Sequence, residues 1–303
     1  MTAPHAFITG GSSGIGLAVA KRLALKGWRL SLLARDEHKL EQAKNALALL
    51  RYRRGQCSSI SEQIGAEPSV PIDILTLSAD LTDPAQTVNA ARHAIATMGA
   101  PQLLVNCAGM ARPGHFIEMP LDIHRRTMDV NYFGTLTMIR ALAPAMIDMG
   151  GGKIVLISSG AGLVGIFGYS AYSPTKFAVR GLAEVLRAEL KPLGIRVFVV
   201  YPPDTDTPQL AEENRYKPPE TRAITGSATT RSAEMVAAAI LSGINKNRFL
   251  IAPGWEMALL ARLHSLLGPV IHRYVDSVIR HKRALQAKQT TLLGIFNVRR
   301  RRP

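Results

Sequence analysis

Short, continuous apolar runs alternate with amphipathic stretches along the first 250 residues, and this alternation constrains the fold more than any other feature. The runs are rich in Val, Ile and Leu without strict polar alternation, which is typical of strands covered on both faces. Strands that alternate with helices pack as a parallel sheet with right-handed crossovers. The sequence therefore predicts an α/β fold. The expected strands are residues 5–9, 29–34, 72–79, 103–108, 153–158, 196–201 and 249–252.

A glycine-rich segment, TGGSSGIG (9–16), stands between the first expected strand and the helix expected at 16–27. Gly10, Gly14 and Gly16 allow a tight turn, a close approach of backbone to phosphate, and close packing of helix on strand. The helix N-terminus presents free N–H groups and a partial positive charge. The alternative is an ordinary glycine loop, but this position favours dinucleotide binding.

The end of the second strand indicates which dinucleotide is bound. An NAD site carries a carboxylate about 20 residues after the glycines, for the ribose 2′-hydroxyl. Here Ala34 occupies that place, and Arg35 and Lys39 follow. Guanidinium and ammonium groups complement a 2′-phosphate, so the sequence favours NADPH. The alternative is that Arg35 is a solvated loop residue paired with Asp36.

The segment YSPTK (172–176) opens another expected helix, at 172–194, and places Tyr172 and Lys176 four residues apart. Side chains at this spacing share a helix face. A tyrosine has a pKa near 10, and a nearby cation favours its phenolate form. Ser159 lies thirteen residues upstream, where the fifth strand ends, and its hydroxyl can hydrogen-bond a substrate carbonyl. The alternative for Ser159 is a helix-capping or loop serine.

Together, TGGSSGIG, NCAG (106–109), DVNYFGT (129–135), Ser159 and YSPTK resemble the short-chain dehydrogenase/reductase family in order and spacing. The resemblance covers about residues 5–200. It implies a Rossmann-like, doubly wound parallel sheet of about seven strands, and hydride transfer with NADPH/NADP+. It implies that Tyr172 is the general acid and that Lys176 lowers its pKa. It also implies that Ser159 orients the carbonyl and that Asn131 anchors a water. The expected cofactor-binding residues are Gly10, Ser12, Ser13, Gly14, Ile15, Gly16, Arg35, Lys39, Asp80, Leu81, Asn106, Ala108, Gly109, Tyr172, Lys176, Pro202 and Thr205.

The run YPPDTDTPQLAEENRYKPPETRAI (201–224), with NCAGMA and GIFGYSAYS, resembles one branch of this family, the 3-ketodihydrosphingosine reductases. That branch reduces the 3-ketone of 3-oxosphinganine to sphinganine in sphingolipid biosynthesis. We expect residues 202–231 to form an irregular substrate loop or lid beside the nicotinamide. Asp204 and Asp206 are candidates to attract the substrate amine. The alternative is that these acids cap the following helix.

Two other functions are compatible with the same residues. One is an NADPH-dependent reductase of another apolar ketone, such as a steroid, a retinoid or a 3-oxoacyl chain. The other is a dinucleotide-sensing protein without catalysis. The complete set of Asn131, Ser159, Tyr172 and Lys176 disfavours the sensor, because sensing needs no proton relay.

The last part of the chain differs in character from residues 1–253, which we expect to form the NADP-binding catalytic domain. Residues 262–303 carry ten Lys or Arg and one acid, within a net charge of +15. Apolar residues recur there at helical spacing, with an expected break at Gly268–Pro269. We expect 254–303 to be a basic amphipathic helical extension and tail, and 255–303 to contact an anionic membrane, helped by RRRR (299–302). The alternatives are a helix folded on the domain or on a partner copy.

The compartment follows from what the sequence lacks. There is no basic-then-apolar signal segment and no run of about 18 apolar residues. Cys57 and Cys107 are the only cysteines, so neither a disulfide framework nor a cysteine-based zinc site is expected. The basic tail has no interleaved aromatics, which disfavours nucleic-acid binding. We therefore expect a cytoplasmic protein, peripheral on the cytoplasmic face of a membrane, with no metal.

Overall fold

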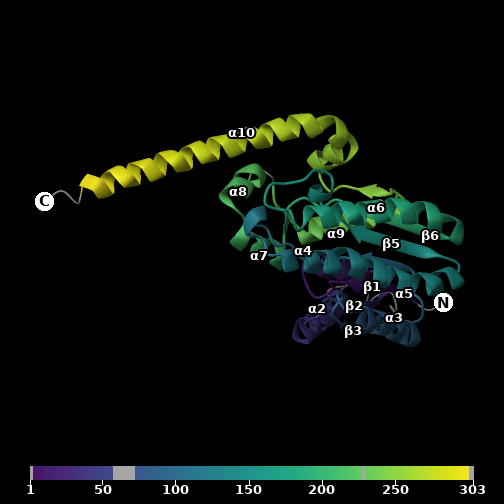
Figure 1. The fold of residues 1–303 in the computed structure, drawn as a ribbon. Helices are drawn as coiled ribbons and strands as arrows, with labels where there is room; N and C mark the ends of the chain where they lie inside the picture. The colour runs from purple at the N-terminus through teal and green to yellow at the C-terminus, as the bar shows by residue number, and fades with distance from the viewer. Residues whose placement is uncertain (1–2, 57–71, 227–228, 300–303) are drawn as a thin grey trace.

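Seven parallel strands form one sheet through the centre of the protein (Figure 1). The structure is a computed structural model that describes residues 3–56, 72–226 and 229–299. The strand order is β3-β2-β1-β4-β5-β6-β9, and every neighbouring pair is parallel. All seven predicted strands are confirmed, with ends shifted by two residues or fewer. They are β1 (His5–Thr9), β2 (Arg29–Ala34), β3 (Ile74–Ser78), β4 (Leu103–Asn106), β5 (Gly152–Ile157), β6 (Ile195–Val200) and β9 (Leu250–Ile251).

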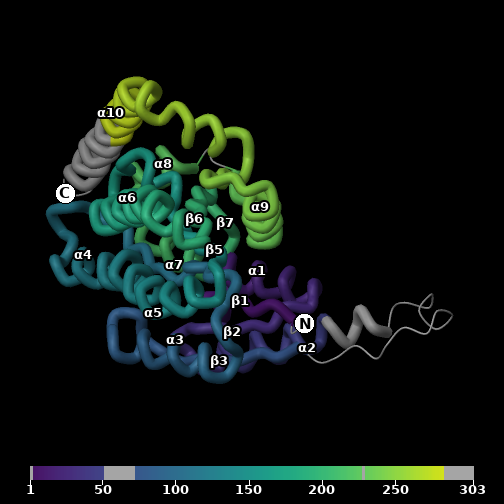
Figure 2. Tube along the Cα trace, turned by 90° about the vertical axis from the view of Figure 1, so that its right-hand side faces the viewer, coloured from purple at the N-terminus to yellow at the C-terminus, as the bar shows by residue number. Residues whose placement is uncertain are grey.

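Helices cover both faces of the sheet (Figure 2), as the doubly wound expectation requires. Successive side chains of a strand point to opposite faces. On β1, Phe7 joins one core cluster, whereas Ala6 and Ile8 join the other. The face of Ala6 and Ile8 is covered by α1 (Gly14–Ala24), α2 (Glu37–Gln56) and α9 (Ala233–Asn245). The face of Phe7 is covered by α3 (Pro84–Met98), α5 (Gly134–Asp148) and α6 (Ser173–Leu190).

The strand order reverses beside β1, which lies between β2 and β4. The last residue of β1, Thr9, pairs with Asn106, the last residue of β4. In doubly wound sheets the crevice for a ligand opens at this switch point, outside the carboxyl ends of the strands. Shorter elements complete this part of the chain: η2 (Phe116–Glu118), α4 (Leu121–Met128), the π-helical turn η3 (Asp129–Phe133), η4 (Gly160–Gly162) and η5 (Lys191–Leu193).

Residues 202–231 are more regular than expected. They contain α7 (Pro208–Tyr216) and α8 (Pro219–Thr225), and a two-stranded pairing of β7 (Thr205–Asp206) with β8 (Arg231–Ser232). Thr207 caps α7, because its Oγ1 accepts the Leu210 N–H at 3.3 Å. Proline occupies the first helical position of both helices, where a missing N–H costs nothing. The expectation that an aspartate caps the following helix is therefore wrong.

The chain ends in one long helix, α10 (Trp255–Arg299). The expected break at Gly268–Pro269 is wrong, since the helix continues through the proline. Figure 1 shows instead that α10 changes direction in its first part and then extends away from the sheet. The helix α10 contacts α8 and η4. The arginines at 300–302 lie outside the described residues.

Candidate active site

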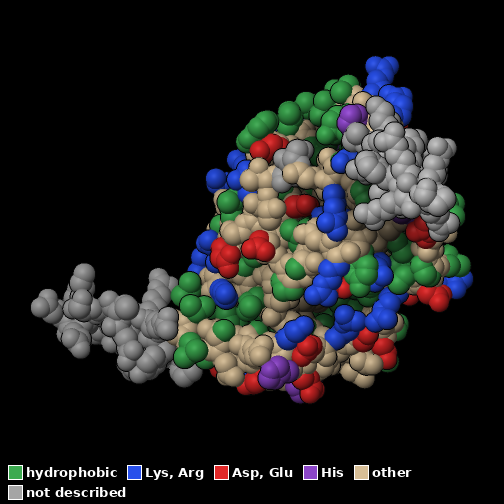
Figure 3. All heavy atoms as spheres, turned by 90° about the vertical axis from the view of Figure 1, so that its left-hand side faces the viewer, with side chains coloured by type: hydrophobic (Ala, Val, Ile, Leu, Met, Phe, Trp, Pro, Cys, Tyr) green, Lys and Arg blue, Asp and Glu red, His purple; other side chains and the backbone are tan. Residues whose placement is uncertain are grey.

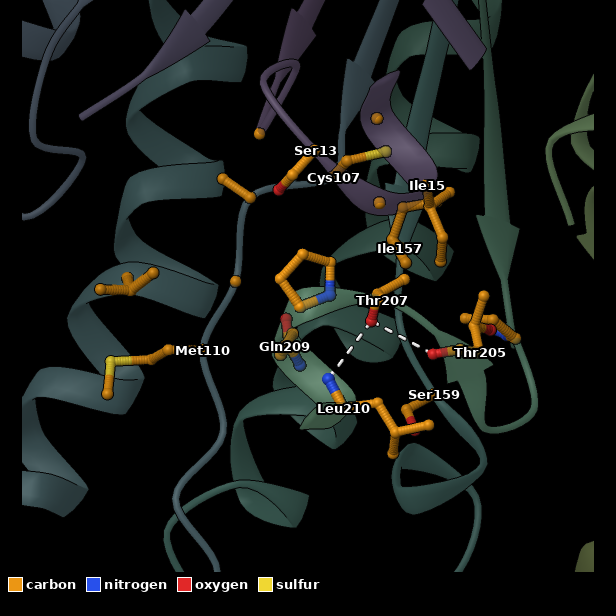
Figure 4. A pocket seen from close by; sticks show the side chains of 18 of the residues that line it. Ser13, Ile15, Cys107, Met110, Ile157, Ser159, Thr205, Thr207, Gln209 and Leu210 are labelled. Atoms are coloured by element: carbon orange, nitrogen blue, oxygen red, sulfur yellow. Dashed lines mark hydrogen bonds between the residues drawn. The ribbon is translucent and has the colours of Figure 1, made fainter. Parts of the chain in front are cut away.

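A cavity of about 350 Å³ opens at the carboxyl edge of the sheet, between the strand ends and α7 (Figure 4). The glycine-rich loop, the β5 end and α7 contribute Ser13, Ser159 and Gln209 to its wall. All of the predicted site residues line this cavity except Asn106 and Asn131. The fold therefore brings together side chains from segments that are far apart in the sequence.

The glycine-rich loop forms a tight turn over the carboxyl end of β1. Gly10 has φ +66°, in the left-handed region that favours glycine. At Gly16 a Cβ would collide with the carbonyl oxygen of Gly10, so α1 can begin this close to the loop only with glycine there. Gly14, Ile15 and Gly16, at the start of α1, line the cavity, where a helix N-terminus suits a bound pyrophosphate.

The end of β2 presents basic side chains to the cavity. Arg35, Asp36 and Lys39 all line it. Asp36 pairs with Lys39 at 3.6 Å, so the alternative in which Asp36 pairs with Arg35 is wrong. No ion pair involves Arg35 among the described residues. Its charge helps to lower the pKa of Asp80, and its guanidinium lines the cavity where an anion could meet it.

The two asparagines lie behind the cavity wall rather than in it. Asn106 is buried, and its Nδ2 donates to the Val155 carbonyl at 3.4 Å. Asn131 accepts the Met110 N–H at 2.8 Å, and its Nδ2 donates to the Met110 carbonyl and to Thr175 Oγ1. These bonds join the turn η3 to the segment after β4 and to the start of α6. They correct the expectation that Asn106 borders the cavity directly, because its side chain points into the sheet.

Tyr172 and Lys176 lie at the start of α6 and are both buried. The Lys176 Nζ donates to the Ile157 carbonyl at 3.0 Å and lies 5.5 Å from the centre of the Tyr172 ring. Ser159 accepts the Ala161 N–H at 3.2 Å, which confirms the capping alternative for this serine. That bond uses an acceptor site of the hydroxyl and leaves its proton available to a third group in the cavity.

Burial dominates the acid–base properties of this cluster. Burial, followed by the charge of Glu213, raises the pKa of Tyr172 above its ordinary value. Hydrogen bonding with Ser159 lowers the pKa of Tyr172, but by less. Burial also lowers the pKa of Lys176 to about 8. The expectation that Lys176 lowers the pKa of Tyr172 stays a prediction; the Lys176 ammonium here donates to the Ile157 carbonyl.

Residues of α7 complete the cavity, and the sequence reasoning missed them. Gln209, Leu210 and Glu213 line it, together with Tyr169 from the segment before α6. Of the two expected acids, Asp204 lines the cavity and pairs with Lys217 at 3.6 Å. Asp206 is exposed and lies outside the lining. The spacing of Gln209 and Glu213, four residues apart behind a capping threonine, was the signal that could have revealed them.

The chain belongs to the short-chain dehydrogenase family, as the sequence motifs predicted. A family model described as short chain dehydrogenase matches residues 4–218. Among solved structures, a short-chain dehydrogenase from Sphingobium yanoikuyae in complex with NADPH has a TM-score of 0.69 and 30% sequence identity. It covers 90% of this chain and 96% of its own.

Several reductases that act on 3-dehydrosphinganine are more similar to this chain in sequence than that solved structure is. A 3-dehydrosphinganine reductase from Danio rerio is 39% identical over 267 residues, which is 88% of this chain and 76% of that protein. A 3-ketodihydrosphingosine reductase from Dictyostelium discoideum is 38% identical over 286 residues, or 91% of this chain and 82% of that protein. This likeness agrees with the branch of the family that residues 201–224 indicated.

In the described part of the chain, no helix combines the length and the apolar character needed to cross a membrane. The first part of α10 nevertheless exposes large apolar side chains. Leu259, Leu263, Leu266, Val270 and Tyr274 recur every three or four residues and are between 37% and 77% exposed. Figure 3 shows hydrophobic side chains gathered along the upper edge of the molecule, where this part of α10 runs.

Proposed function

We propose that this protein is an NADPH-dependent reductase that converts the 3-ketone of 3-oxosphinganine into the alcohol of sphinganine. The observation that carries the proposal is the convergence of Ser159, Tyr172 and Lys176 on a single cavity with the glycine-rich loop. The similarity to named 3-dehydrosphinganine reductases supports the choice of substrate.

The cavity fits a phosphorylated dinucleotide. Gly10 and Gly16 allow the backbone to approach a pyrophosphate, as the conformation of the loop requires. Arg35 has no ion-pair partner among the described residues and can meet a 2′-phosphate, with Lys39 beside it. The NADPH complex of the structural relative supports the same choice. When bound, NADPH supplies the hydride that the ketone carbon accepts.

Tyr172 acts as the general acid in the proposed mechanism. Its phenol proton passes to the ketone oxygen, which becomes the product hydroxyl. Ser159 donates a hydrogen bond to the same oxygen and orients it, since its acceptor site is already engaged with Ala161 N–H. Lys176, whose pKa is lowered to about 8, returns a proton toward the phenolate and holds the ribose. Asn131 positions the start of α6 through Thr175; its role as a water anchor stays a prediction.

Oxidation of NADPH measured with a panel of ketones tests the proposal. The panel contains 3-oxosphinganine, a steroid ketone, a retinoid and a 3-oxoacyl thioester. We expect the kcat/KM for 3-oxosphinganine to exceed the others at least tenfold. If another ketone gave the highest kcat/KM, the protein would still be a reductase, but the proposed substrate would be wrong. Dinucleotide binding without turnover of any ketone would favour the sensing protein.

We also propose that the apolar ridge of α10, defined as Leu259, Leu263, Leu266, Val270 and Tyr274, lies on an anionic membrane surface. Arg262, Arg273 and Arg280 flank the ridge on the same helix and complement anionic lipid. A protein held at the membrane surface could take up a lipid substrate directly from the membrane.

Sedimentation with vesicles that contain phosphatidylserine tests this location. We expect the double variant Leu266→Glu with Val270→Glu to lose at least tenfold in vesicle binding while it keeps its NADPH affinity. Leu193→Glu, at an exposed apolar position outside α10, is the matched control. Equal vesicle binding by both variants would contradict the membrane contact. A dimer that forms with rising protein concentration would instead indicate that the apolar ridge packs against a second copy of the chain.

A further inference from the structure

The strongest unassigned feature of the cavity is a buried carboxylate. Glu213 on α7 is 8% exposed and lines the cavity together with Tyr172. Its Oε2 accepts the Tyr169 hydroxyl at 3.0 Å, and its Oε1 accepts Gln209 Nε2 at 2.9 Å. Both donors are neutral. A carboxylate offers about four acceptor sites, so these two bonds leave it able to accept more.

No cation in the described part of the chain lies within ion-pair distance of Glu213. Lys217 is paired with Asp204 at 3.6 Å, and its charge only partly offsets the burial of Glu213 by lowering the pKa of that carboxyl. The charge of Glu213 in turn raises the pKa of Lys176, which donates to the Ile157 carbonyl. A buried charge without a counterion is costly, because protein dipoles replace only part of its hydration. Burial accordingly raises the pKa of Glu213. A cationic ligand beside Glu213 would favour its carboxylate form and neutralise the charge of that form.

Glu213 also lies close to the position where the ketone must react. The Tyr169 ring that contacts it is 5.6 Å from the ring of Tyr172, centre to centre. After burial, the charge of Glu213 is the next largest cause that raises the pKa of Tyr172. Tyr172 and Glu213 line the same cavity, so a ketone oxygen hydrogen-bonded to Tyr172 leaves the adjacent carbon within the cavity that Glu213 lines.

We propose that Glu213 is the residue that receives the ammonium group of an α-amino ketone whose carbonyl oxygen meets Tyr172 and Ser159. This inference rests on the proposed function, in which the substrate carries its amine on the carbon next to the ketone. It replaces the earlier expectation for Asp204 and Asp206, because the first is paired with Lys217 and the second lies outside the lining.

The same contact affects turnover as well as binding. When Tyr172 gives its proton to the ketone oxygen, a phenolate forms near the Glu213 carboxylate, and the two negative charges repel. A substrate ammonium bound to Glu213 offsets this repulsion. A ketone without the amine leaves the repulsion in place and is reduced more slowly. The arrangement thus selects amino ketones in the chemical step, where differences in transition-state binding count most.

The experiment compares two ketones that differ only in the amine: 3-oxosphinganine and 1-hydroxyoctadecan-3-one. Wild type, Glu213→Gln and the matched control Glu212→Gln are assayed for kcat/KM with each. Glu212 neighbours Glu213 on α7 but pairs with Arg215 on the exposed side. For Glu213→Gln we expect a loss of about 10- to 100-fold with the amino ketone, consistent with a charge-assisted contact. We expect no loss with the other ketone, because the substitution removes the charge that repels the phenolate. Equal losses with both ketones would overturn the proposal, as would a similar loss in Glu212→Gln.

The wild-type protein gives a second test that does not depend on whether the Glu213→Gln variant folds. Folding of the variant is checked separately, by fluorescence titration of its NADPH binding. We expect wild type to prefer the amino ketone at least tenfold in kcat/KM. If wild type reduces both ketones equally well, the ammonium site is refuted and the reductase stands. If it reduces neither, the proposed function itself fails.

Discussion

The hydroxyl of Tyr169 donates a 3.0 Å hydrogen bond to the carboxylate of Glu213, although 44 positions separate the two residues in sequence. This bond fastens α7 to the segment that leads into α6, which carries Tyr172 and Lys176. The part of the chain expected to contact substrate is in this way held against the part expected to perform the chemistry.

Removal of that bond should loosen the cavity. Tyr169→Phe takes a donor from a buried carboxylate, and an unsatisfied buried acceptor costs about 1–3 kcal/mol. We expect the free energy of unfolding, measured in urea, to fall by that amount. The control is Tyr274→Phe, since Tyr274 is 49% exposed on α10. An unchanged stability of Tyr169→Phe would show that the bond contributes little.

Tyr172→Phe should abolish turnover and keep the cofactor. The variant retains the buried ring but lacks the acidic proton, so we expect kcat to fall at least 1,000-fold, at the strong end of general acid catalysis. NADPH affinity, followed by fluorescence titration, should change less than threefold. Tyr132→Phe, outside the cavity lining, should behave as wild type. Turnover near the wild-type level in Tyr172→Phe would remove this residue from the mechanism.

Arg35→Ala should shift the preference between dinucleotides. A guanidinium that meets a 2′-phosphate contributes a charge-assisted bond of about 1.5–3 kcal/mol, or roughly 10- to 100-fold in affinity. We therefore expect NADPH to bind that much more weakly while NADH binding stays constant. Lys44→Ala, on the exposed face of α2, removes the same charge as a control. Parallel losses for both dinucleotides would contradict contact with the 2′-phosphate.

Stability should fall in mild acid because of His5. This side chain is buried in β1, where its ring contacts the Gly99 carbonyl and Ser31 Oγ, each at 2.9 Å. Burial lowers its pKa from 6.5 to about 4, so the unfolded chain binds more protons between those values. Stability is therefore full above pH 6.5 and falls as the pH drops toward 4, by about 3 kcal/mol from this group. Urea titrations at both ends of this window measure the loss, and His5→Gln should abolish most of it.

Sequence patterns confined to short segments predicted most of the fold. The seven strands follow from apolar runs, because a strand covered on both faces needs apolar side chains on both. The glycine-rich loop and the four-residue spacing of Tyr172 and Lys176 depend only on a turn and one helix. Each of these features is complete within a few consecutive residues, so each could be read from the sequence.

The direction of individual polar side chains depended instead on packing between distant segments. Asn106 and Asn131 end up behind the cavity wall, since sheet and helix neighbours provide their hydrogen bonds. The helical nature of α7 was missed, and with it the carboxylate of Glu213. By itself the sequence determined the parallel sheet, the family and the candidate pair of Tyr172 and Lys176. Only the tertiary structure decided which acid is buried in the cavity wall, because the partner of Glu213, Tyr169, is remote in the chain and burial arises only when the two segments meet.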